Sequence, residues 1–428
     1  MTEGRFDAWR RRAQADRVLA SLAGGVDVSV ALTGEVPIGR IVLADPIEWP
    51  KSGPESGPAP ALTLSAPDSF WHGLMSGTAP PGGHGLGAAL ATGAQLKIDG
   101  RPGLLARARP ALERLFELAA PVRMDDGAPW AGDAALPVGR YADLATDTGE
   151  RARIYFESSG PTVDPSLPPV VFLHTAGADS RQFHFQLADG GLSRNRRLYA
   201  FDMPRHGRSL PLTDRSPFER ADLDAKAYIG WCKTFMERVV GEPAILIGCS
   251  MGAMAALMTA ADHPDLVAGA IAVEAPERSP DRRSADLSDP GLDQTRFVPA
   301  YVRSLMSPHS PERYRDLATW IYSQGGFSTY VNDIAFYSRA FDGSAVATRL
   351  NAAKMPVALL TGSYDYSASP ASTQKLHAVL PQSRFVEMTE LGHFPMIENP
   401  PVFTRYLADA LAFVDDGRTD KKPDRSNP

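Results

Sequence analysis

The sequence is poor in cysteine. Only Cys232 and Cys249 occur among 428 residues, so a disulfide framework is excluded. Such low cysteine content is typical of proteins from reducing compartments. Apolar runs of the roughly 20 residues that a transmembrane helix needs are absent, and residues 1–12 are charged, unlike a secretory signal segment. These absences predict a cytoplasmic protein without a membrane span.

An excess of positive charge is also missing. The 44 Lys and Arg residues are outnumbered by 50 Asp and Glu residues, and the resulting net charge of −6 argues against nucleic acid as a partner. The 9 His residues lack the spacing of metal ligands. There is no Walker-type phosphate loop, and residues 82–85 (GGHG) lack the strand-to-helix setting of a dinucleotide fingerprint. We therefore expect neither a metal nor another cofactor.

Apolar residues, by contrast, are plentiful. They make up 43% of the chain, and charged residues make up 22%, which is typical of a globular protein. A chain of 428 residues is long enough for more than one domain and for a substantial core.

The most informative stretch is residues 244–252, which read AILIGCSMG. An apolar run ends there in Gly-x-Ser-x-Gly and is followed by a helix-forming segment that stops at His263-Pro264. This is the pattern of a nucleophile elbow, a sharp strand-to-helix turn that exposes a serine to a base and to backbone N–H donors. The pattern predicts Ser250 as a nucleophile.

Two further segments place chemically useful residues after apolar strands. Residues 356–360 lead into a loop that holds Asp365, and residues 385–388 lead into a loop that holds His393. The carboxyl ends of parallel strands meet at one edge of a sheet, where sites form. The order Ser, acid, His matches the order that follows a nucleophile elbow. Ser250, Asp365 and His393 are therefore the predicted nucleophile, orienting acid and base.

From about residue 138 to residue 412 the chain resembles the α/β-hydrolases of the esterase and lactonase kind. The resemblance rests on the elbow and on residues 169–177 (PVVFLHTAG), 197–209 (RLYAFDMPRHGRS) and 391–395 (LGHFP). It implies a mostly parallel sheet with helices on both faces and a helical cap. It also implies a serine hydrolase that needs no cofactor and cleaves a carboxylic ester or lactone of an apolar small molecule through an acyl-enzyme.

The sequence departs from the family pattern at Thr175 and Arg205, which stand where glycine is usual. An oxyanion hole needs two backbone donors. The resemblance assigns them to the N–H of Met251 and to the turn after His174, where the N–H of Ala176 is preferred and that of Thr175 is the alternative. Some members of the family carry their acid after the strand that follows the elbow, which makes Glu274 the alternative to Asp365.

Several other residues are candidates for the substrate pocket. Aromatic side chains are frequent between residues 297 and 341, where we expect three helices of a cap, over 297–306, 311–324 and 329–341. An aromatic cap over a serine site favours an apolar substrate. The pocket candidates are His174, Cys249, Trp320, Tyr322 and Phe394. His206 and Asp202 are expected to hold the loop after residues 197–201 in shape.

The first 123 residues predict a smaller α+β domain. Helices are expected over 5–22 and 102–118, the second kinked or interrupted near Pro110, with strands over 26–32, around 62–64 and over 95–100 and a short helix from Asp68. Residues 68–77, 94–100 and the closing helix resemble a sterol-carrier-protein-2-type domain, which implies a tunnel for lipid-like ligands. The alternatives are that the domain packs against the hydrolase, covers its entrance or forms a homodimer.

Together these observations predict four parts. They are an α+β domain (1–123), a linker (124–137), a hydrolase domain (138–414) with a cap at about 276–350, and a disordered tail (415–428). Three other functions stay open. They are hydrolysis of a carbon–carbon bond, hydrolysis of an amide or carbamate on the same triad, and lipid binding or transfer.

Overall fold

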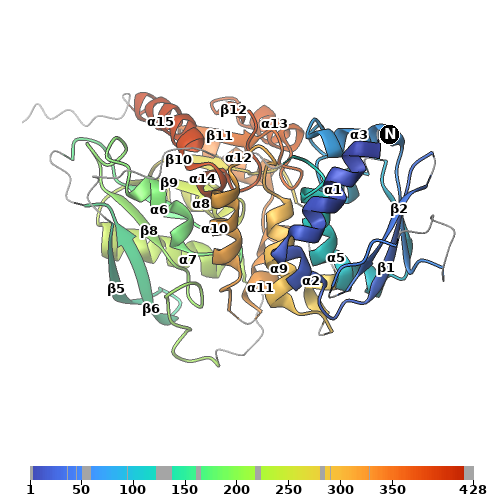
Figure 1. Cartoon of the computed structure of the whole chain (residues 1–428). Helices are drawn as coiled ribbons and strands as arrows, with labels where there is room; N and C mark the ends of the chain where they lie inside the picture. The colour runs from blue at the N-terminus through green and yellow to red at the C-terminus, as the bar shows by residue number, and fades with distance from the viewer. Residues whose placement is uncertain are drawn as a thin grey trace, which may run out of the picture. The chain divides into compact units, whose positions relative to one another are not determined.

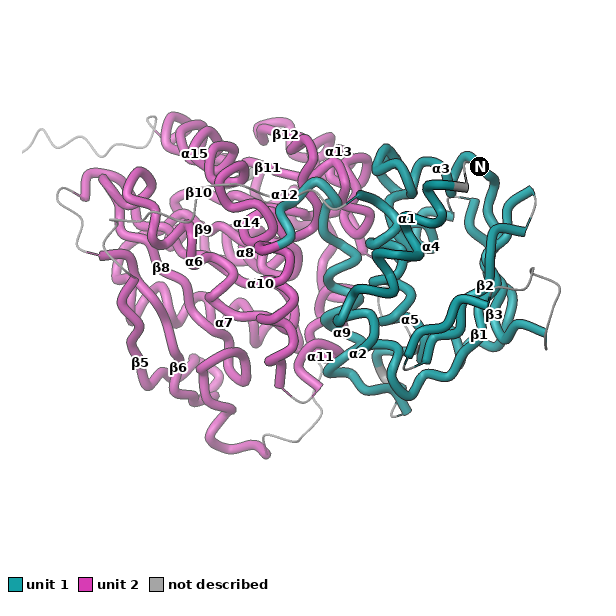
Figure 2. The backbone as a smooth tube through the Cα atoms, viewed as in Figure 1, with its two compact units in different colours: residues 1–125, 285–312 teal, residues 126–284, 313–428 magenta. Residues whose placement is uncertain are grey.

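The computed structural model describes residues 3–35, 37–44, 46–50, 59–93, 95–121, 137–160, 165–216, 223–279, 285–289, 291–326 and 328–418 (Figure 1). Most of the predicted linker, and the predicted tail from residue 419 on, lie outside these residues. The chain forms two compact units (Figure 2). Unit 1 comprises residues 1–125 and 285–312, and unit 2 comprises residues 126–284 and 313–428.

Unit 2 is built on an eight-stranded sheet with the order β12-β11-β10-β9-β7-β8-β6-β5. The six strands from β12 to β8 are parallel, and β6 and β5 continue the sheet in antiparallel pairing. The bounds are β5 (Val138–Ala145), β6 (Arg151–Ser158), β7 (Val170–Leu173), β8 (Leu198–Phe201), β9 (Ala244–Cys249), β10 (Val267–Val273), β11 (Val357–Gly362) and β12 (Arg384–Met388).

The central strands are apolar because both faces of the sheet are covered. Every residue of β7, β8, β9 and β11 is buried, as expected for parallel strands between helical layers. The helical segments of unit 2 are η1 (Ser180–Phe183), α6 (His184–Leu187), α7 (Ala225–Phe235), η2 (Met236–Val240), α8 (Met251–Asp262), α10 (Glu312–Tyr322, its first residue in unit 1), α11 (Thr329–Arg339), α12 (Gly343–Ala352), α13 (Pro370–Val379), α14 (Pro395–Glu398) and α15 (Pro400–Asp416). The predicted α/β architecture is confirmed.

The parallel strands end at one edge of the sheet, and each end leads into a predicted site segment. Ser250 follows β9, Glu274 follows β10 and Asp365 lies in the loop after β11. His393 follows β12, and the turn at residues 174–177 follows β7. Strand order therefore gathers residues that lie up to 219 positions apart in sequence, from 174 to 393.

Unit 1 holds a four-stranded sheet with the order β2-β1-β3-β4, and its core contains the buried rings of Trp9, Trp71 and Phe116. Strands β1 and β3 are parallel, and the other pairs are antiparallel. The elements are α1 (Glu3–Ala15), α2 (Arg17–Ala23), β1 (Val28–Thr33), β2 (Pro37–Leu43), β3 (Leu62–Ser65), α3 (Asp68–Ser76), α4 (Leu86–Thr92), β4 (Lys97–Gly100), α5 (Pro102–Glu117), η3 (Ala285–Ser288) and α9 (Gln294–Ser304). A smaller α+β domain is thus present.

Three details of unit 1 differ from the sequence predictions. The predicted helix 5–22 is divided into α1 and α2, because the side chain of Asp16 caps α2 by accepting the Leu19 N–H at 2.6 Å. Strand β2 was not predicted. Helix α5 continues through Pro110 without an interruption.

The predicted cap at 276–350 is divided between the two units. Helix α9 belongs to unit 1, where it packs on α5. The guanidinium of Arg109 on α5 lies over the rings of Phe297 and Tyr301 on α9, and Arg303 pairs with Glu117 at 2.9 Å. These contacts explain why residues 285–312 fold with the N-terminal segment. In the described part of the chain, no helix combines the length and the apolar character needed to cross a membrane.

Candidate active site

The elbow places Ser250 between β9 and α8 in a strained backbone conformation, with φ 55° and ψ −115°. A non-glycine residue at positive φ is costly and persists only where the surroundings enforce it. The close approach of strand and helix does so here. An added Cβ at Gly248 or Gly252 would overlap backbone atoms, at Gly252 the carbonyl oxygens of Leu173 and His174. Glycine at both positions is therefore a steric requirement of the turn.

We predict that Gly252→Ala destabilises the protein by at least about 3 kcal/mol, since backbone atoms cannot move aside as a side-chain tip can. Urea unfolding monitored by circular dichroism would measure the change. Gly230→Ala on α7 is the matched control, because a Cβ there meets no atom within 4 Å, and alanine in a helix is expected to be neutral or stabilising. Equal stability of the two variants would contradict the steric argument.

The structure brings together Ser250, Asp365 and His393. The Nε2 atom of His393 lies 3.0 Å from the Ser250 Oγ, and its Nδ1 atom lies 2.6 Å from the Asp365 Oδ2. All three residues are buried. Because a carboxylate can only accept, Nδ1 carries the proton toward Asp365, and the lone pair of Nε2 faces the serine hydroxyl. This is the tautomer that a general base needs.

The Asp365 carboxylate is held in its ionised form. Burial by itself would raise its pKa, but His393 and several hydrogen bonds outweigh burial and lower the pKa to about 2. Its Oδ1 accepts the backbone N–H of Ser367 at 2.6 Å and of Ala368 at 3.0 Å. The carboxylate therefore keeps its charge and its orientation toward His393 across the neutral pH range.

Glu274, the alternative acid, stands beside Asp365 and makes no hydrogen bond to His393. Its Oε1 accepts the N–H of Gly362 at 2.9 Å. Burial and the neighbouring charge of Asp365 raise the pKa of Glu274 well above its usual value, because two adjoining buried carboxyl groups cannot both ionise. Glu274 is thus the protonated member of the pair and can donate a hydrogen bond to Asp365.

The same three groups are the cluster best placed to hold a metal ion among the described residues. One ligand atom each from Glu274, Asp365 and His393 lies within 4.8 Å of the others. A cation there would compete with the Nδ1 proton of His393 and would require Glu274 to ionise beside Asp365. The observed hydrogen bond between His393 and Asp365 fits a proton better than a metal.

The two backbone N–H groups predicted to form the oxyanion hole, those of Met251 and Ala176, have no acceptor among the described residues. Met251 begins α8, where the first N–H groups of a helix lack internal partners. The N–H of Thr175 is already used, because it donates to the Gln182 Oε1 at 3.0 Å. Of the two predicted donors in the turn after β7, Ala176 is therefore the one that is available.

Two of the five pocket candidates lie beside the triad. The centre of the Phe394 ring lies 4.8 Å from the centre of the His393 ring, and the centre of the Tyr322 ring lies 5.4 Å from that of Phe394. The Tyr322 hydroxyl is hydrogen-bonded to the Thr175 Oγ1. Burial raises the pKa of Tyr322, which stays a neutral phenol. These rings give the site an aromatic wall.

The other three candidates do not form this wall. Trp320 is 53% exposed, and the guanidinium of Arg181 lies 5.2 Å from its ring centre. Residues 320 and 322 lie two positions apart on α10 and so point to nearly opposite sides of the helix. His174 and Cys249 are buried in structural roles. His174 accepts the Met203 N–H on Nε2 at 3.1 Å, and the Cys249 thiol donates to the carbonyl of His393.

Two residues that shape the turn after β7 were missed by sequence reasoning. Gln182 holds Thr175, and Asp333 on α11 accepts the Gly177 N–H at 2.7 Å. Neither lies in a motif, so no local pattern could have identified them. Arg205, one of the two departures from the family pattern, has φ 71° and so keeps the left-handed conformation of the glycine that it replaces.

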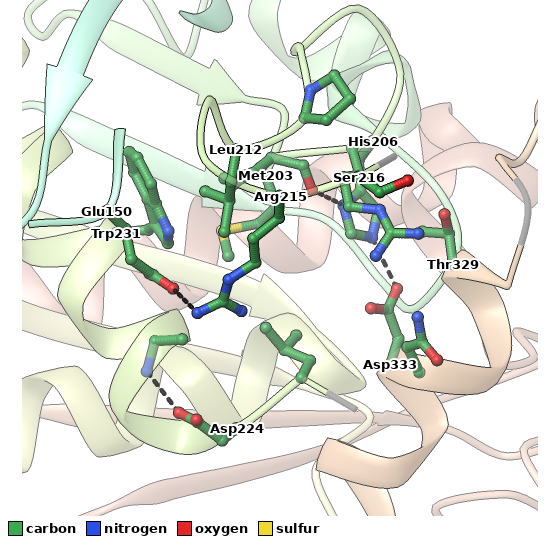
Figure 3. A pocket seen from close by; sticks show the side chains of 16 residues that line it. Glu150, Met203, His206, Leu212, Arg215, Ser216, Asp224, Trp231, Thr329 and Asp333 are labelled. Carbon is green, nitrogen blue, oxygen red and sulfur yellow. Dashed lines mark hydrogen bonds and ion pairs between the residues drawn. The ribbon is translucent and has the colours of Figure 1, made fainter. Parts of the chain in front are cut away.

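A separate pocket of about 130 Å³ lies between the loop after β8, α7 and α11 (Figure 3). Met203, Leu212 and Trp231 supply apolar walls, and Arg215 pairs with Glu150 at 3.4 Å on its polar side. Ser250, Asp365 and His393 are not among its lining residues. The pocket is nevertheless connected with the turn after β7. His206 and Asp333 line the pocket, and Asp333 accepts the N–H of Gly177 in that turn.

Comparison with known proteins agrees with this fold. Residues 170–405 match the sequence profile described as "Alpha/beta hydrolase family". The chloroplastic pheophytinase of Arabidopsis thaliana is 21% identical over an alignment of 326 residues that covers 64% of this chain and 67% of that protein. The zearalenone hydrolase of Cladophialophora bantiana is 24% identical over 268 residues, 60% of this chain and 91% of that protein. The crystal structure of the enol-lactonase from Burkholderia xenovorans superposes with a TM-score of 0.53 at 20% identity, covering 64% of this chain and all of that one.

Proposed function

Because this chain belongs to the alpha/beta hydrolase family, we propose that it is a serine hydrolase that cleaves a carboxylic ester or lactone of an apolar small molecule through an acyl-enzyme. The observation that carries the proposal is the hydrogen-bonded series Ser250, His393 and Asp365, with distances of 3.0 and 2.6 Å. The N–H groups of Met251 and Ala176 support the proposal, because an oxyanion hole needs two backbone donors and neither group has an acceptor among the described residues.

The proposed reaction follows from these atoms. The Nε2 of His393 removes the Ser250 proton as Oγ attacks the carbonyl carbon, and Asp365 stabilises the imidazolium that forms. The N–H groups of Met251 and Ala176 stabilise the negative charge on the carbonyl oxygen. The imidazolium then protonates the leaving alkoxide, which departs and leaves an acyl group on Oγ. Water, deprotonated by the same nitrogen, attacks this acyl group. The carboxylic acid departs, and the imidazolium returns a proton to Oγ, which regenerates the serine.

The surroundings of the triad support an apolar substrate. Tyr322 and Phe394 place aromatic rings next to His393, and both rings are buried. The triad itself is shielded from water, which strengthens the electrostatic interactions inside it. An apolar acyl or alcohol group that packs on these rings would add binding energy without a need for charged partners.

A panel of substrates tests this proposal. We expect turnover of aryl esters, with KM falling as the acyl chain lengthens until the aromatic wall is covered. A vinylogous diketone and the matching amide and carbamate serve as the other arms, because the same triad can cleave carbon–carbon and carbon–nitrogen bonds. If the protein hydrolysed the diketone, the amide or the carbamate faster than the esters, the bond in that compound would be the one it cleaves, and the proposed ester hydrolysis would be wrong.

The role of unit 1 stays a prediction. The resemblance to sterol-carrier-protein-2-type domains would give it a lipid-binding role, whereas the family match begins only at residue 170. Because α9 belongs to unit 1, a fragment that ends near residue 120 would lack one of its helices. Binding of a fluorescent fatty acid should therefore be measured on the full-length Ser250→Ala variant, where saturable binding supports lipid capture and its absence opposes it.

A further inference from the structure

The proposed oxyanion donor Ala176 lies between two anchored peptide groups. The Thr175 N–H donates to Gln182 on one side, and the Gly177 N–H donates to the Asp333 Oδ2 at 2.7 Å on the other. The Ala176 N–H between them has no acceptor among the described residues. The two anchors therefore restrict the rotation of the peptide that carries this N–H.

The Asp333 anchor is itself held by His206. The Nε2 of His206 lies 2.7 Å from the Asp333 Oδ2, and its Nδ1 lies 3.0 Å from the Pro204 carbonyl oxygen. Figure 3 shows both side chains on the wall of the pocket, joined by a dashed line. A carbonyl and a carboxylate are both acceptors, so both ring nitrogens must carry protons. His206 is thus an imidazolium in a buried ion pair with Asp333.

The other charged or titratable groups around His206 are consistent with this state. The ring of His174, after β7, lies 4.8 Å away, and burial followed by the charge of His206 lowers the pKa of His174 to about 4, so that it is neutral. Asp202 after β8 adds negative charge. Burial by itself would lower the pKa of His206. The negative charge of Asp333 and its hydrogen bond outweigh burial, so that the pKa of His206 is raised. The remaining charged residues of this pocket are Glu150, Arg205, Arg215 and Asp224.

We propose that the His206–Asp333 ion pair positions the oxyanion donor, the N–H of Ala176. The pair does so because it links α11 to the peptide group that follows Ala176. The carboxylate accepts the Gly177 N–H only while His206 keeps Oδ2 in place, so the geometry of the hole depends on a residue of α11. His206 and Asp333 act through Ala176 and do not touch the substrate. This inference rests on the proposed function, because it assigns a use to the pair in stabilising the oxyanion.

The test compares Asp333→Ala with Asp333→Asn on an aryl ester. Alanine removes the acceptor for the Gly177 N–H. We expect kcat to fall about 10- to 100-fold, which is less than the loss expected when an oxyanion donor is removed outright. KM should change by less than about 3-fold. Asparagine can place its amide oxygen where Oδ2 lies, so that it accepts both the Gly177 N–H and the Nε2–H of His206 and only the charge is lost. We therefore expect kcat to recover to within about 5-fold of the wild type. Binding of an aryl trifluoromethyl ketone, whose adduct carries an oxyanion, should weaken in parallel with kcat.

Asp415→Asn is the control for general loss of stability. It disrupts another ion pair of unit 2, that of the partly buried Asp415 with Arg196, away from the turn after β7. We expect it to lower the melting temperature without lowering kcat. The proposal is overturned if Asp333→Ala keeps kcat within 2-fold of the wild type, if its loss appears in KM alone, or if Asp415→Asn loses as much kcat.

A second readout does not need activity. Hydrogen–deuterium exchange of the peptide that spans residues 174–178 should accelerate in Asp333→Ala and stay slow in Asp415→Asn. Unchanged exchange would show that the tether does not hold the turn, and faster exchange with unaltered kcat would show that the tether has no catalytic use. Failure of the proposed function would appear separately, as a wild type that hydrolyses no ester while the exchange result still decides whether the tether exists.

The charge of His206 predicts a dependence on pH. A group whose pKa is raised by folding stabilises the protein below its unfolded pKa of about 6.5, and this contribution is lost as pH rises through the folded pKa. Asp333→Asn cannot form the ion pair, so its deficit in melting temperature relative to the wild type should be largest below pH 6.5 and shrink at alkaline pH. A deficit that does not change with pH would contradict a charged His206.

Discussion

Replacing Ser250 with alanine should lower kcat/KM for an aryl ester at least about 10⁴-fold, because the proposed mechanism has no other group that can form the acyl-enzyme. The residual rate would come from the two backbone donors and from substrate binding. The fold should persist, since the side chain of Ser250 donates to His393 alone among the described contacts. Steady-state kinetics and a thermal melt on the same preparation would measure both outcomes.

Cys249→Ala is the matched control for this variant. The thiol is the adjacent nucleophilic group in the elbow, but it is fully buried and burial raises its pKa well above the usual value. A thiol in that state is a poor nucleophile. Cys249→Ala should therefore keep kcat/KM within about 10-fold of the wild type, a loss that reflects packing. If Ser250→Ala kept most of its activity while Cys249→Ala lost it, the assignment of the nucleophile would be wrong.

The second large effect is expected for Asp365→Asn, with kcat lowered about 10³- to 10⁴-fold. An amide nitrogen facing Nδ1 favours the tautomer in which Nε2 carries the proton, and Nε2 can then no longer accept the proton of Ser250. The buried imidazolium would also lose its counter-charge. The pH–rate profile and the pre-steady-state burst on an aryl ester would show that acylation is the step affected.

Glu274→Gln is the matched control, because it alters the neighbouring carboxyl group and keeps its shape. Glu274 is protonated, so glutamine can still accept the Gly362 N–H and donate to Asp365. We expect kcat within about 5-fold of the wild type. A loss for Glu274→Gln as large as that for Asp365→Asn would instead identify Glu274 as the orienting acid.

The three residues of the proposed triad could be selected from the sequence because each one sits in a local pattern. Ser250 lies in the elbow, and Asp365 and His393 each follow an apolar strand. Parallel pairing of β9, β10, β11 and β12 then brings the strand ends together without further information. The sequence favoured Asp365 over Glu274, although both follow a strand. In the structure, Asp365 is hydrogen-bonded to His393.

What the sequence could not supply are contacts between distant segments. Gln182 and Asp333 reach the turn after β7 from η1 and α11, and no motif marks either one. The sequence offers Tyr322 and Trp320 equally as pocket residues. The orientation of α10 in the structure buries the ring of Tyr322 and exposes that of Trp320. The assignment of residues 285–312 to unit 1 depends on the packing of α9 on α5, which an amphipathic pattern alone cannot specify.

The measurement that tests the central claim most directly is the intact mass of the wild type and of Ser250→Ala after treatment with a fluorophosphonate probe. The account predicts one probe adduct per wild-type chain and none on the variant, since only a serine activated by His393 attacks phosphorus at a useful rate. Peptide mapping should place the adduct on Ser250. An unlabelled wild type, or equal labelling of both proteins, would contradict the proposal that Ser250 is an activated nucleophile.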